Sequence, residues 1–257
     1  MTIFYFTGTG NSLAVAKRIG GSLKQSFNLI SIPQVIGSDN LNYKDDVIGV
    51  VFPVYALAAP QMVRQFLEKV KFEAEYTFAI GTYGGIPGTV MMNVQKLARK
   101  NGYRFDYAES ILMVDNFLPT FNIEKEIAKL PEKKIEEKTA QIIEDINNRK
   151  HNQAKGSIPY RIFTAMISGI IKYDKYAQNY YVNDKCNKCG ICPQFCPAKN
   201  ITVSDKVNFS NHCVACFACL NHCPQNAIHH KKEKSNARWR NPEVSVNEII
   251  AANNRRN

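Results

Sequence analysis

The chain has 257 residues, of which 45% are hydrophobic and 21% are charged, so it has enough apolar mass for a packed core. This composition excludes a chain that is disordered throughout. The formal net charge is +11, which taken alone suggests nucleic acid, an anionic membrane surface or acidic partners. The eight cysteines complicate that interpretation, because a metal-bound thiolate adds a negative charge whereas a thiol or a disulfide does not.

The first residues and the longest apolar stretch carry no targeting or membrane signal. No basic segment leads an apolar core after Met1, so a secretory signal is not expected. The apolar stretch 47–63 is broken by two prolines and is shorter than the ~20 residues that a spanning helix needs. We therefore expect no transmembrane segment and a cytoplasmic chain whose cysteines stay unbridged in reducing conditions.

Up to about residue 118, short apolar runs alternate with helical stretches. Continuous apolar runs are typical of strands covered on both faces, and the helices between them are typical of parallel crossovers. This pattern predicts an α/β domain with a doubly wound parallel five-stranded sheet. The expected strands are 3–6, 28–32, 47–52, 76–80 and 110–114, and the expected helices are 12–27, 60–70 and 89–100.

The rest of the chain divides by composition. Residues 123–149 are charged and helix-favouring, with an interruption at Pro131, and indicate a covering helix. Residues 158–181 are apolar and rich in Tyr. An interfacial membrane helix is one interpretation, but the mixed pattern favours a helix that docks between domains. The predicted units are a first domain (1–150), a connector with this helix (151–181), a small α+β cysteine domain (182–230) and a basic tail (231–257).

The cysteines form two runs with the same spacing, C-x2-C-x2-C-x3-C-P. Both runs place an isoleucine at the same offset past the proline, Ile201 and Ile228, so the unit is duplicated. In this doubled arrangement the fourth cysteine of each run ligates the cluster of the other run. The predicted ligands are Cys186, Cys189, Cys192 and Cys223 for one [4Fe-4S] cluster (cluster 1) and Cys213, Cys216, Cys219 and Cys196 for the other (cluster 2).

Structural zinc is the alternative for this region. Zinc sites use pairs of C-x2-C but do not need a third cysteine at x2 or a fourth at x3 before proline. Residues 182–230 resemble the bacterial two-cluster ferredoxins, with all eight ligand positions present. Pro193, directly after a third cysteine, is a departure that should alter the local turn without removing a ligand.

A loop rich in glycine and in hydroxyl side chains follows the first expected strand and precedes a helix. Its glycines allow a tight turn and close approach of an anion, and the helix N-terminus adds partial positive charge. No Lys-Ser/Thr pair completes a P-loop, and Leu13 stands where G-x-G-x-x-G needs its third glycine. A simple turn in which Ser12 caps the helix is the alternative. The predicted phosphate-binding residues are Thr7, Gly8, Thr9, Gly10, Asn11 and Ser12.

Because of this loop, residues 1–118 resemble the flavodoxins, whose first loop holds the phosphate of FMN. The resemblance implies a flavin ring at the carboxyl ends of the central strands, where two further loops emerge. Tyr55 and Tyr83 are candidates to flank the ring, although they could simply cover strand ends. Asp115-Asn116 reaches the same rim, and a turn explains that pair equally well. The predicted residues in the two loops are Pro53, Val54, Tyr55, Ala56, Thr82, Tyr83, Gly84 and Gly85.

As a whole, the chain resembles the flavodoxin-ferredoxin fusion proteins of anaerobic bacteria and archaea. The resemblance implies FMN, two [4Fe-4S] clusters and an FMN- and ferredoxin-dependent oxidoreductase that reduces a small acceptor or a redox partner protein. A pure electron carrier between two enzymes and a non-redox zinc module that binds nucleic acid are the alternatives. Whether FMN and clusters meet within one chain or across a homodimer is left open.

The basic charge has a second explanation in the cofactors themselves. Thiolate-bound clusters and an FMN phosphate are anions, so they offset part of the +11, and we expect no nucleic-acid partner. Trp239 lies between Arg238 and Arg240, and we expect it to anchor a tail that packs back on the molecule. No nucleophile paired with a base and no second glycine-rich fingerprint is present, which argues against hydrolysis and direct NAD(P)H oxidation.

Overall fold

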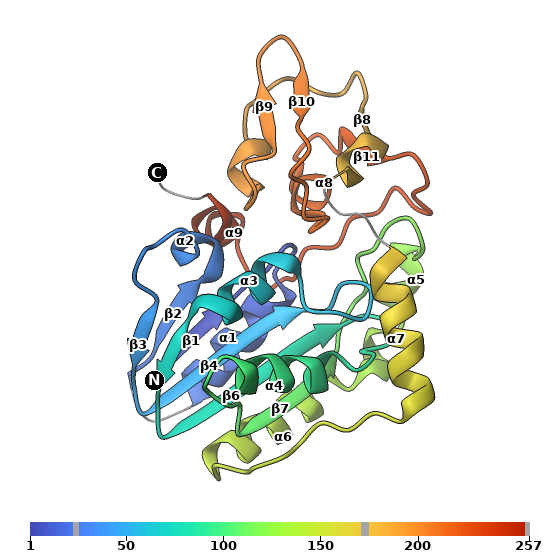
Figure 1. Cartoon of the computed structure of the whole chain (residues 1–257). Coiled ribbons are helices and arrows are strands. Elements are labelled where there is room, and N and C mark those ends of the chain that lie inside the picture. The colour runs from blue at the N-terminus through green and yellow to red at the C-terminus, as the bar shows by residue number, and fades with distance from the viewer. Residues whose placement is uncertain (23–25, 171–174, 255–257) are drawn as a thin grey trace.

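The computed structural model of the chain describes residues 1–22, 26–170 and 175–254. Its first part is built on one sheet with the strand order β2-β1-β4-β6-β7, in which all neighbours are parallel (Figure 1). Counted along the chain this order is 2-1-3-4-5, that of flavodoxin-like doubly wound folds. The predicted sheet is therefore confirmed. Its strands are β1 (Thr2–Tyr5), β2 (Asn28–Ser31), β4 (Val47–Pro53), β6 (Tyr76–Tyr83) and β7 (Tyr107–Leu112).

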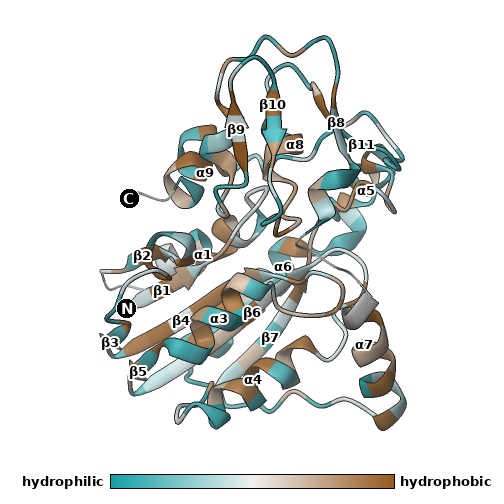
Figure 2. Cartoon of the chain, turned by 45° about the horizontal axis from the view of Figure 1, so that its top comes forward, coloured by the Kyte–Doolittle hydropathy of each residue, from teal (hydrophilic) through white to brown (hydrophobic). Residues whose placement is uncertain are grey.

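Helices cover both faces of the sheet, which is why its central strands are continuous apolar runs. Strand β4 is buried from Val47 to Phe52 and is largely brown in Figure 2. Helices α1 and α6 pack together, as do α3 and α4, and Figure 1 shows the two pairs on opposite faces. The helices of this part are α1 (Asn11–Ser22), α2 (Ile32–Val35), α3 (Gln61–Lys69), α4 (Val90–Lys100), α5 (Ile123–Ala128), η1 (Leu130–Lys133) and α6 (Ile135–Asn147).

Some element boundaries differ from the prediction. The last strand of the sheet begins at Tyr107, three residues before the expected start, because its ladder with β6 begins there. The helix expected over 12–27 ends at Ser22, and residues 23–25 lie outside the described part. A short parallel pair beside the sheet was not predicted. It consists of β3 (Asn42–Lys44) and β5 (Lys71–Glu73).

The cysteine region is a small unit of short elements that lies over one end of the sheet (Figure 1). Strand β8 (Tyr180–Val182) pairs antiparallel with β11 (Ile228–His230), so the helix expected up to residue 181 was wrong at its end. The pairing closes the unit around both cysteine runs. Its other elements are η2 (Tyr176–Asn179), η3 (Cys192–Phe195), β9 (Ile201–Val203), β10 (Val207–Phe209) and α8 (Ala218–His222).

The tail returns from the cysteine region to the first sheet and ends in α9 (Val246–Asn253). A capping box between Ser245 and Glu248 starts this helix. The Ser31 hydroxyl donates to the carbonyl of Ala252 at 2.6 Å, and Asn253 Nδ2 donates to the carbonyl of Thr7 at 3.1 Å. The tail is therefore part of the packed structure rather than an appendage.

Helix α7 (Ile158–Ile170) runs along the side of the molecule, below the cysteine region in Figure 1. Its outward face exposes Ile158, Ile162 and Met166 by 71%, 58% and 66%. Among the described residues no part of the chain covers that face, while Ile167 of the same helix lies beside the cysteine region. Docking of this helix between the two domains stays a prediction. Residues 171–174, which belong to the predicted connector, lie outside the described residues. In the part of the chain that the structure describes, no helix combines the length and the apolar character needed to cross a bilayer.

Candidate functional site

The loop 7–12 connects β1 to α1 and turns over the edge of the sheet. The Thr7 hydroxyl oxygen accepts the backbone N–H of Gly10 at 3.1 Å, and the Thr9 hydroxyl oxygen accepts the side-chain amide of Asn116. Because each hydroxyl is used as an acceptor from inside the protein, its proton is left as a donor. The first N–H groups of α1 have no acceptor within the helix. Donors of these kinds, with the positive end of a helix, fit a phosphate group.

Gly10 occupies a different position from the one predicted. It has a φ of 101°, and a Cβ there would lie 2.9 Å from Cβ of Asn241 and 3.1 Å from Cβ of Val244. Gly10 therefore faces the tail and does not line the cavity beside the loop. The missing Cβ allows the tail to pass beneath the loop, so this glycine supports the loop from behind.

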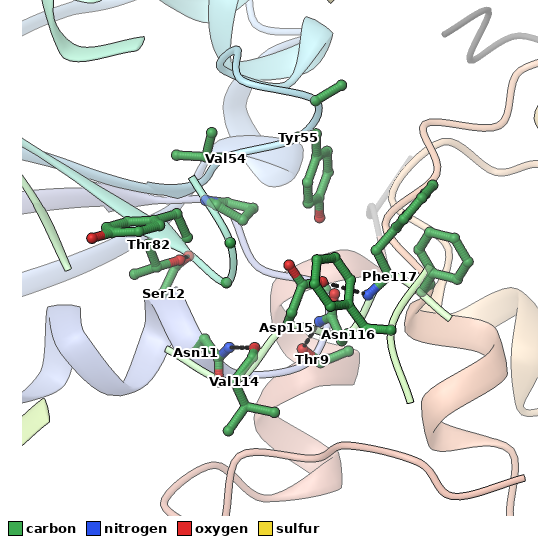
Figure 3. Close-up of a pocket in the computed structure, with 18 of the residues that line it drawn as sticks. Thr9, Asn11, Ser12, Val54, Tyr55, Thr82, Val114, Asp115, Asn116 and Phe117 are labelled. Atoms are coloured by element: carbon green, nitrogen blue, oxygen red, sulfur yellow. Dashed lines mark hydrogen bonds between the residues drawn. The ribbon is translucent and has the colours of Figure 1, made fainter. Parts of the chain in front are cut away.

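A cavity of about 290 Å³ opens between the loop, the ends of the strands and the cysteine region. Figure 3 shows Tyr55 reaching from the loop after β4 toward Asp115 and Asn116, which follow β7. The structure brings thirteen of the fourteen predicted residues to this one cavity. They are Thr7, Gly8, Thr9, Asn11, Ser12, Pro53, Val54, Tyr55, Ala56, Thr82, Tyr83, Gly84 and Gly85.

The loop after β4 is a tight turn. The backbones of Tyr55 and Ala58 exchange two hydrogen bonds, of 2.9 and 3.0 Å, and the two residues between them have positive φ, 45° at Ala56 and 64° at Leu57. A left-handed conformation costs a non-glycine residue about 1–2 kcal/mol. Strain of this kind is characteristic of functional loops, and here the hydrogen-bonded turn places Tyr55 in the cavity wall.

Asp115 lies against the loop after β6. A Cβ on Gly84 would lie 2.3 Å from Oδ2 of Asp115, so only glycine allows this approach. The Asp115 Oδ1 accepts the backbone N–H of Phe117 at 2.8 Å. Burial raises the pKa of the Asp115 carboxyl to about 6, and the buried Glu126 carboxylate adds to the rise. The cavity wall therefore carries an acid that holds its proton in mildly acidic solution.

Several lining residues were not among the sequence predictions, and most of them are apolar. Phe117 and Phe121 follow β7, and Ile167 comes from α7. Ala215 and Phe217 come from the cysteine region, on either side of Cys216. No local pattern could connect these two residues with a loop more than two hundred positions earlier. The remaining additions are Leu57, Ile86, Val114, Asp115 and Asn116, of which the last two were considered either as site residues or as a turn.

The cysteines surround two further cavities. One is lined by Cys186, Cys189, Cys192 and Cys223, and the other by Cys196, Cys213, Cys216 and Cys219. These are the two sets of four that the crossed spacing predicts, and four thiols around a small closed space suit a cluster. Among the described residues, no three or more His, Cys, Asp or Glu side chains are grouped as they would be to hold a metal ion. Iron binding at these cysteines stays a prediction.

The surroundings of the cysteines disfavour a thiolate without metal and suit a thiolate that is bound to metal. Burial raises the pKa of the Cys192 thiol to about 12, so without metal the thiol stays protonated and iron must displace its proton. Backbone N–H groups point at three sulfur atoms: Asn200 at Cys196 (3.2 Å), Ala227 at Cys223 (3.3 Å) and Ala215 at Cys213 (3.4 Å). Such N–H···S contacts stabilise negative charge on the sulfur.

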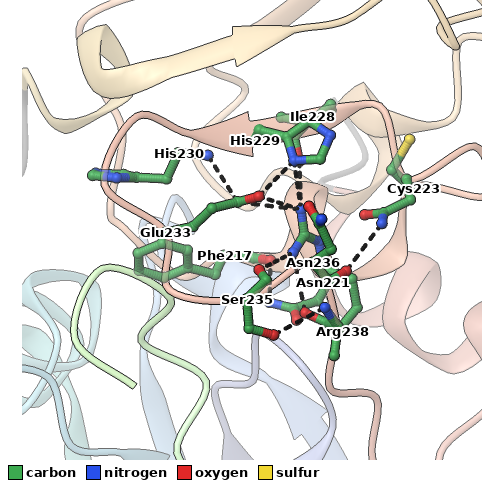
Figure 4. Close-up of polar contacts among 12 residues, drawn as sticks. Phe217, Asn221, Cys223, Ile228, His229, His230, Glu233, Ser235, Asn236 and Arg238 are labelled. Carbon is green, nitrogen blue, oxygen red and sulfur yellow. Dashed lines mark hydrogen bonds and ion pairs between the residues drawn. The ribbon is translucent and has the colours of Figure 1, made fainter. Parts of the chain in front are cut away.

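The tail contacts the cysteine region through polar side chains (Figure 4), and it reaches the phosphate loop at Trp239. Arg238 lies 3.2 Å from the Glu233 carboxylate, which also lies 2.6 Å from Nδ1 of His229, and these three side chains are 10% exposed or less. The next residue, Trp239, is 8% exposed and donates its indole N–H to Asn11 at 2.8 Å. The expectation that Trp239 anchors a tail packed back on the molecule is confirmed.

Known proteins match the cysteine region and the first part of the chain separately. Residues 178–235 match the family "4Fe-4S dicluster domain". A 55-residue stretch, 20% of the chain, is 40% identical to "Pyruvate synthase subunit PorD" of Methanocaldococcus jannaschii. The match spans 64% of that relative, less than two thirds of its length.

The solved structures that resemble the first part include flavoproteins of low sequence identity. A putative flavoprotein from Bacteroides uniformis is 14% identical, with a TM-score of 0.34, and the match covers 51% of this chain and 97% of that one. The two-electron reduced flavodoxin of Megasphaera elsdenii is 19% identical, with a TM-score of 0.31 and coverage of 42% and 83%. The strand order and the family match show a flavodoxin-like α/β sheet joined to a ferredoxin-like 4Fe-4S region.

Proposed function

We propose that the chain is an oxidoreductase in which single electrons pass between two [4Fe-4S] clusters and FMN. One observation carries this proposal: the phosphate loop and Ala215 and Phe217, the neighbours of a predicted cluster ligand, line the same cavity. That shared wall supports transfer within one chain. In this proposal residues 1–150 bind FMN, 182–230 bind the clusters, and 231–257 fasten the two parts together.

Different residues of the cavity contact the phosphate and the ring of FMN in this proposal. The Thr7 and Thr9 hydroxyls and the N-terminus of α1 hold the phosphate, and the strained loop around Tyr55 and the loop at Gly84 lie along the ring. FMN, when bound, takes up two electrons in one-electron steps, whereas each cluster supplies one at a time. Below about pH 6, Asp115 holds a proton at the cavity wall, where two-electron reduction of the flavin would require one.

A carrier without its own substrate is a second candidate. The cavity, about 290 Å³, is at the small end of ligand pockets, which span roughly 300–1,000 Å³. FMN occupies the room that a separate acceptor would need, which favours delivery of electrons to a partner protein. The PorD relative belongs to a multisubunit enzyme by its printed name, and a redox partner enzyme is consistent with that resemblance.

Anaerobic purification followed by analysis of iron, acid-labile sulfide and flavin tests the cofactors. We expect close to eight iron and eight sulfide atoms, as two four-iron clusters require, and one FMN per chain. Zinc in place of iron, or failure to bind added FMN, would refute the proposal. Chemical reduction and exposure to a panel of small acceptors then separates the two functions. An oxidoreductase with its own substrate is reoxidised by a member of the panel, whereas a carrier is reoxidised only by a partner enzyme.

A further inference from the structure

We infer that the two clusters have different places in the electron route: cluster 2 exchanges electrons with FMN through a contact set by Phe217, and cluster 1 exchanges them with the outside donor. This inference rests on the proposed function and deepens it. Four observations support it: the lining of the cavities, the packing of the phosphate loop, the aromatic contacts of Phe217 and a difference between the two cysteine runs.

The lining residues of the three cavities indicate which cluster lies next to the flavin site. Phe217 lines both the flavin cavity and the cavity of cluster 2, whose four cysteines include Cys216 next to it. The cavity of cluster 1 has no lining residue in common with the flavin cavity in the described part of the chain. One of its ligands, Cys189, is exposed, so cluster 1 can be approached from solvent.

The phosphate loop touches the backbone that holds cluster 2. A Cβ built on Gly8 would lie 2.2 Å from the carbonyl oxygen of Cys216, a distance that real side chains do not reach. The loop and the ligand turn are therefore in direct contact through Gly8. The contact therefore places the phosphate loop directly beside the ligand turn of cluster 2.

Phe217 fills the space between the two cavities with its ring. On the flavin side it packs edge-to-face on Phe117, with ring centroids 5.5 Å apart, and on the cluster side it lies 6.1 Å from Tyr180. Phe117 lines the flavin cavity and Tyr180 lines the cavity of cluster 2. Phe217 is 3% exposed, so it lies between the two cavities and away from bulk solvent.

Comparison of the two runs shows that this phenylalanine is a departure. The backbone conformation repeats: Lys188 and Ala215 have φ of 59° and 49°, and two residues later Gly190 and Phe217 have φ of 73° and 56°. In the first run glycine adopts the left-handed conformation without cost and a Cβ there would meet nothing within 4 Å. In the second run a bulky residue accepts about 1–2 kcal/mol of strain. An outlier of this kind points to a role for the side chain, and its contacts join the two sites.

The electrons balance along this route. A low-potential one-electron protein donor of the ferredoxin type is oxidised at cluster 1, which passes the electron to cluster 2. Each transfer past Phe217 oxidises cluster 2 by one electron and reduces FMN by one electron. Two such transfers, with protons from Asp115 and solvent, complete the two-electron reduction.

Reduction potentials of the holoprotein test the order. Cys189→Ser changes a ligand of cluster 1 and therefore marks its EPR spectrum. We expect FMN, through its phosphate charge, to lower the potential of the unmarked cluster in EPR-monitored titrations with and without flavin, and to leave the marked cluster unchanged. A shift in the marked cluster, an equal shift in both or none in either overturns the order. Failure of the protein to bind FMN at all instead counts against the proposed function.

Three variants test Phe217 as a positioning residue. Phe217→Leu should slow flavin reduction after rapid mixing with a reductant, and Phe217→Tyr, which keeps the ring, should restore the rate. Phe209→Leu is the matched control, because Phe209 lines the cavity of cluster 2 but not the flavin cavity. Iron content and FMN affinity confirm that each variant is loaded. An unchanged rate in Phe217→Leu, or equal slowing in Phe209→Leu, refutes the role of Phe217.

Discussion

The indole N–H of Trp239 donates a hydrogen bond of 2.8 Å to Oδ1 of Asn11, 228 positions earlier in the chain. Asn11 Nδ2 donates in turn to the carbonyl of Val114 at 3.0 Å, at the end of the sheet. One asparagine at the start of α1 thus connects the tail, the phosphate loop and the loop after β7. The conformation of the loop that should hold FMN depends on a residue that follows the cysteine region.

Trp239→Phe should weaken FMN binding, because the ring stays packed while the bond to Asn11 is lost. Within the described residues, the side-chain amide of Asn241 also donates to that oxygen, at 3.3 Å. A lost buried hydrogen bond costs about 1 kcal/mol, which corresponds to a roughly fivefold higher dissociation constant. Quenching of FMN fluorescence measures it. Tyr181→Phe, which removes an exposed hydroxyl, is the control and should leave the dissociation constant unchanged.

Gly8→Ala should separate the flavin site from cluster 2. The new Cβ overlaps the backbone carbonyl of Cys216 at 2.2 Å, so either the ligand turn or the phosphate loop must move. We expect slower flavin reduction by the clusters and weaker FMN binding, measured by rapid mixing and by fluorescence. Gly21→Ala is the matched control, since a Cβ at Gly21 meets nothing within 4 Å and alanine stabilises a helix by up to about 1 kcal/mol. Equal behaviour of the two variants would contradict the close contact.

Some of this architecture could be predicted from the sequence because it is encoded locally. Apolar runs between helical stretches predicted the parallel sheet, and the cysteine spacing predicted which four thiols share a cavity. The loop 7–12 was recognisable from six consecutive residues, but the orientation of Gly10 depends on Asn241 and Val244 in the tail. Phe217 was missed for the same reason, because its significance depends on contacts with distant residues. Only its place where the other run has glycine could have drawn attention to it.

Arg238→Met should destabilise the cysteine region. The substitution leaves the Glu233 carboxylate, 10% exposed, without its Arg partner and with His229 Nδ1 as its remaining side-chain contact. Removing one member of a buried ion pair typically costs about 3–5 kcal/mol, because the other charge stays buried. We expect loss of iron at lower temperature or denaturant concentration, followed by cluster absorbance. Lys232→Met, at an exposed position, is the control, and a similar loss in both variants would mean that the buried network contributes little.

The affinity for flavin should fall as the pH rises through about 6, the pKa to which burial raises the Asp115 carboxyl. A flavin that covers this carboxyl desolvates it further and raises its pKa again, so binding takes up a proton. Affinity is then greatest below pH 6, where Asp115 is already neutral, and decreases above it as the proton must be supplied. Riboflavin is the appropriate ligand, because it lacks the phosphate that titrates in the same range. Fluorescence titrations from pH 5 to 7.5 should show several-fold weaker binding at the upper end in the natural protein and a flat profile in Asp115→Asn. The same pH dependence in both proteins would assign the titration to another group.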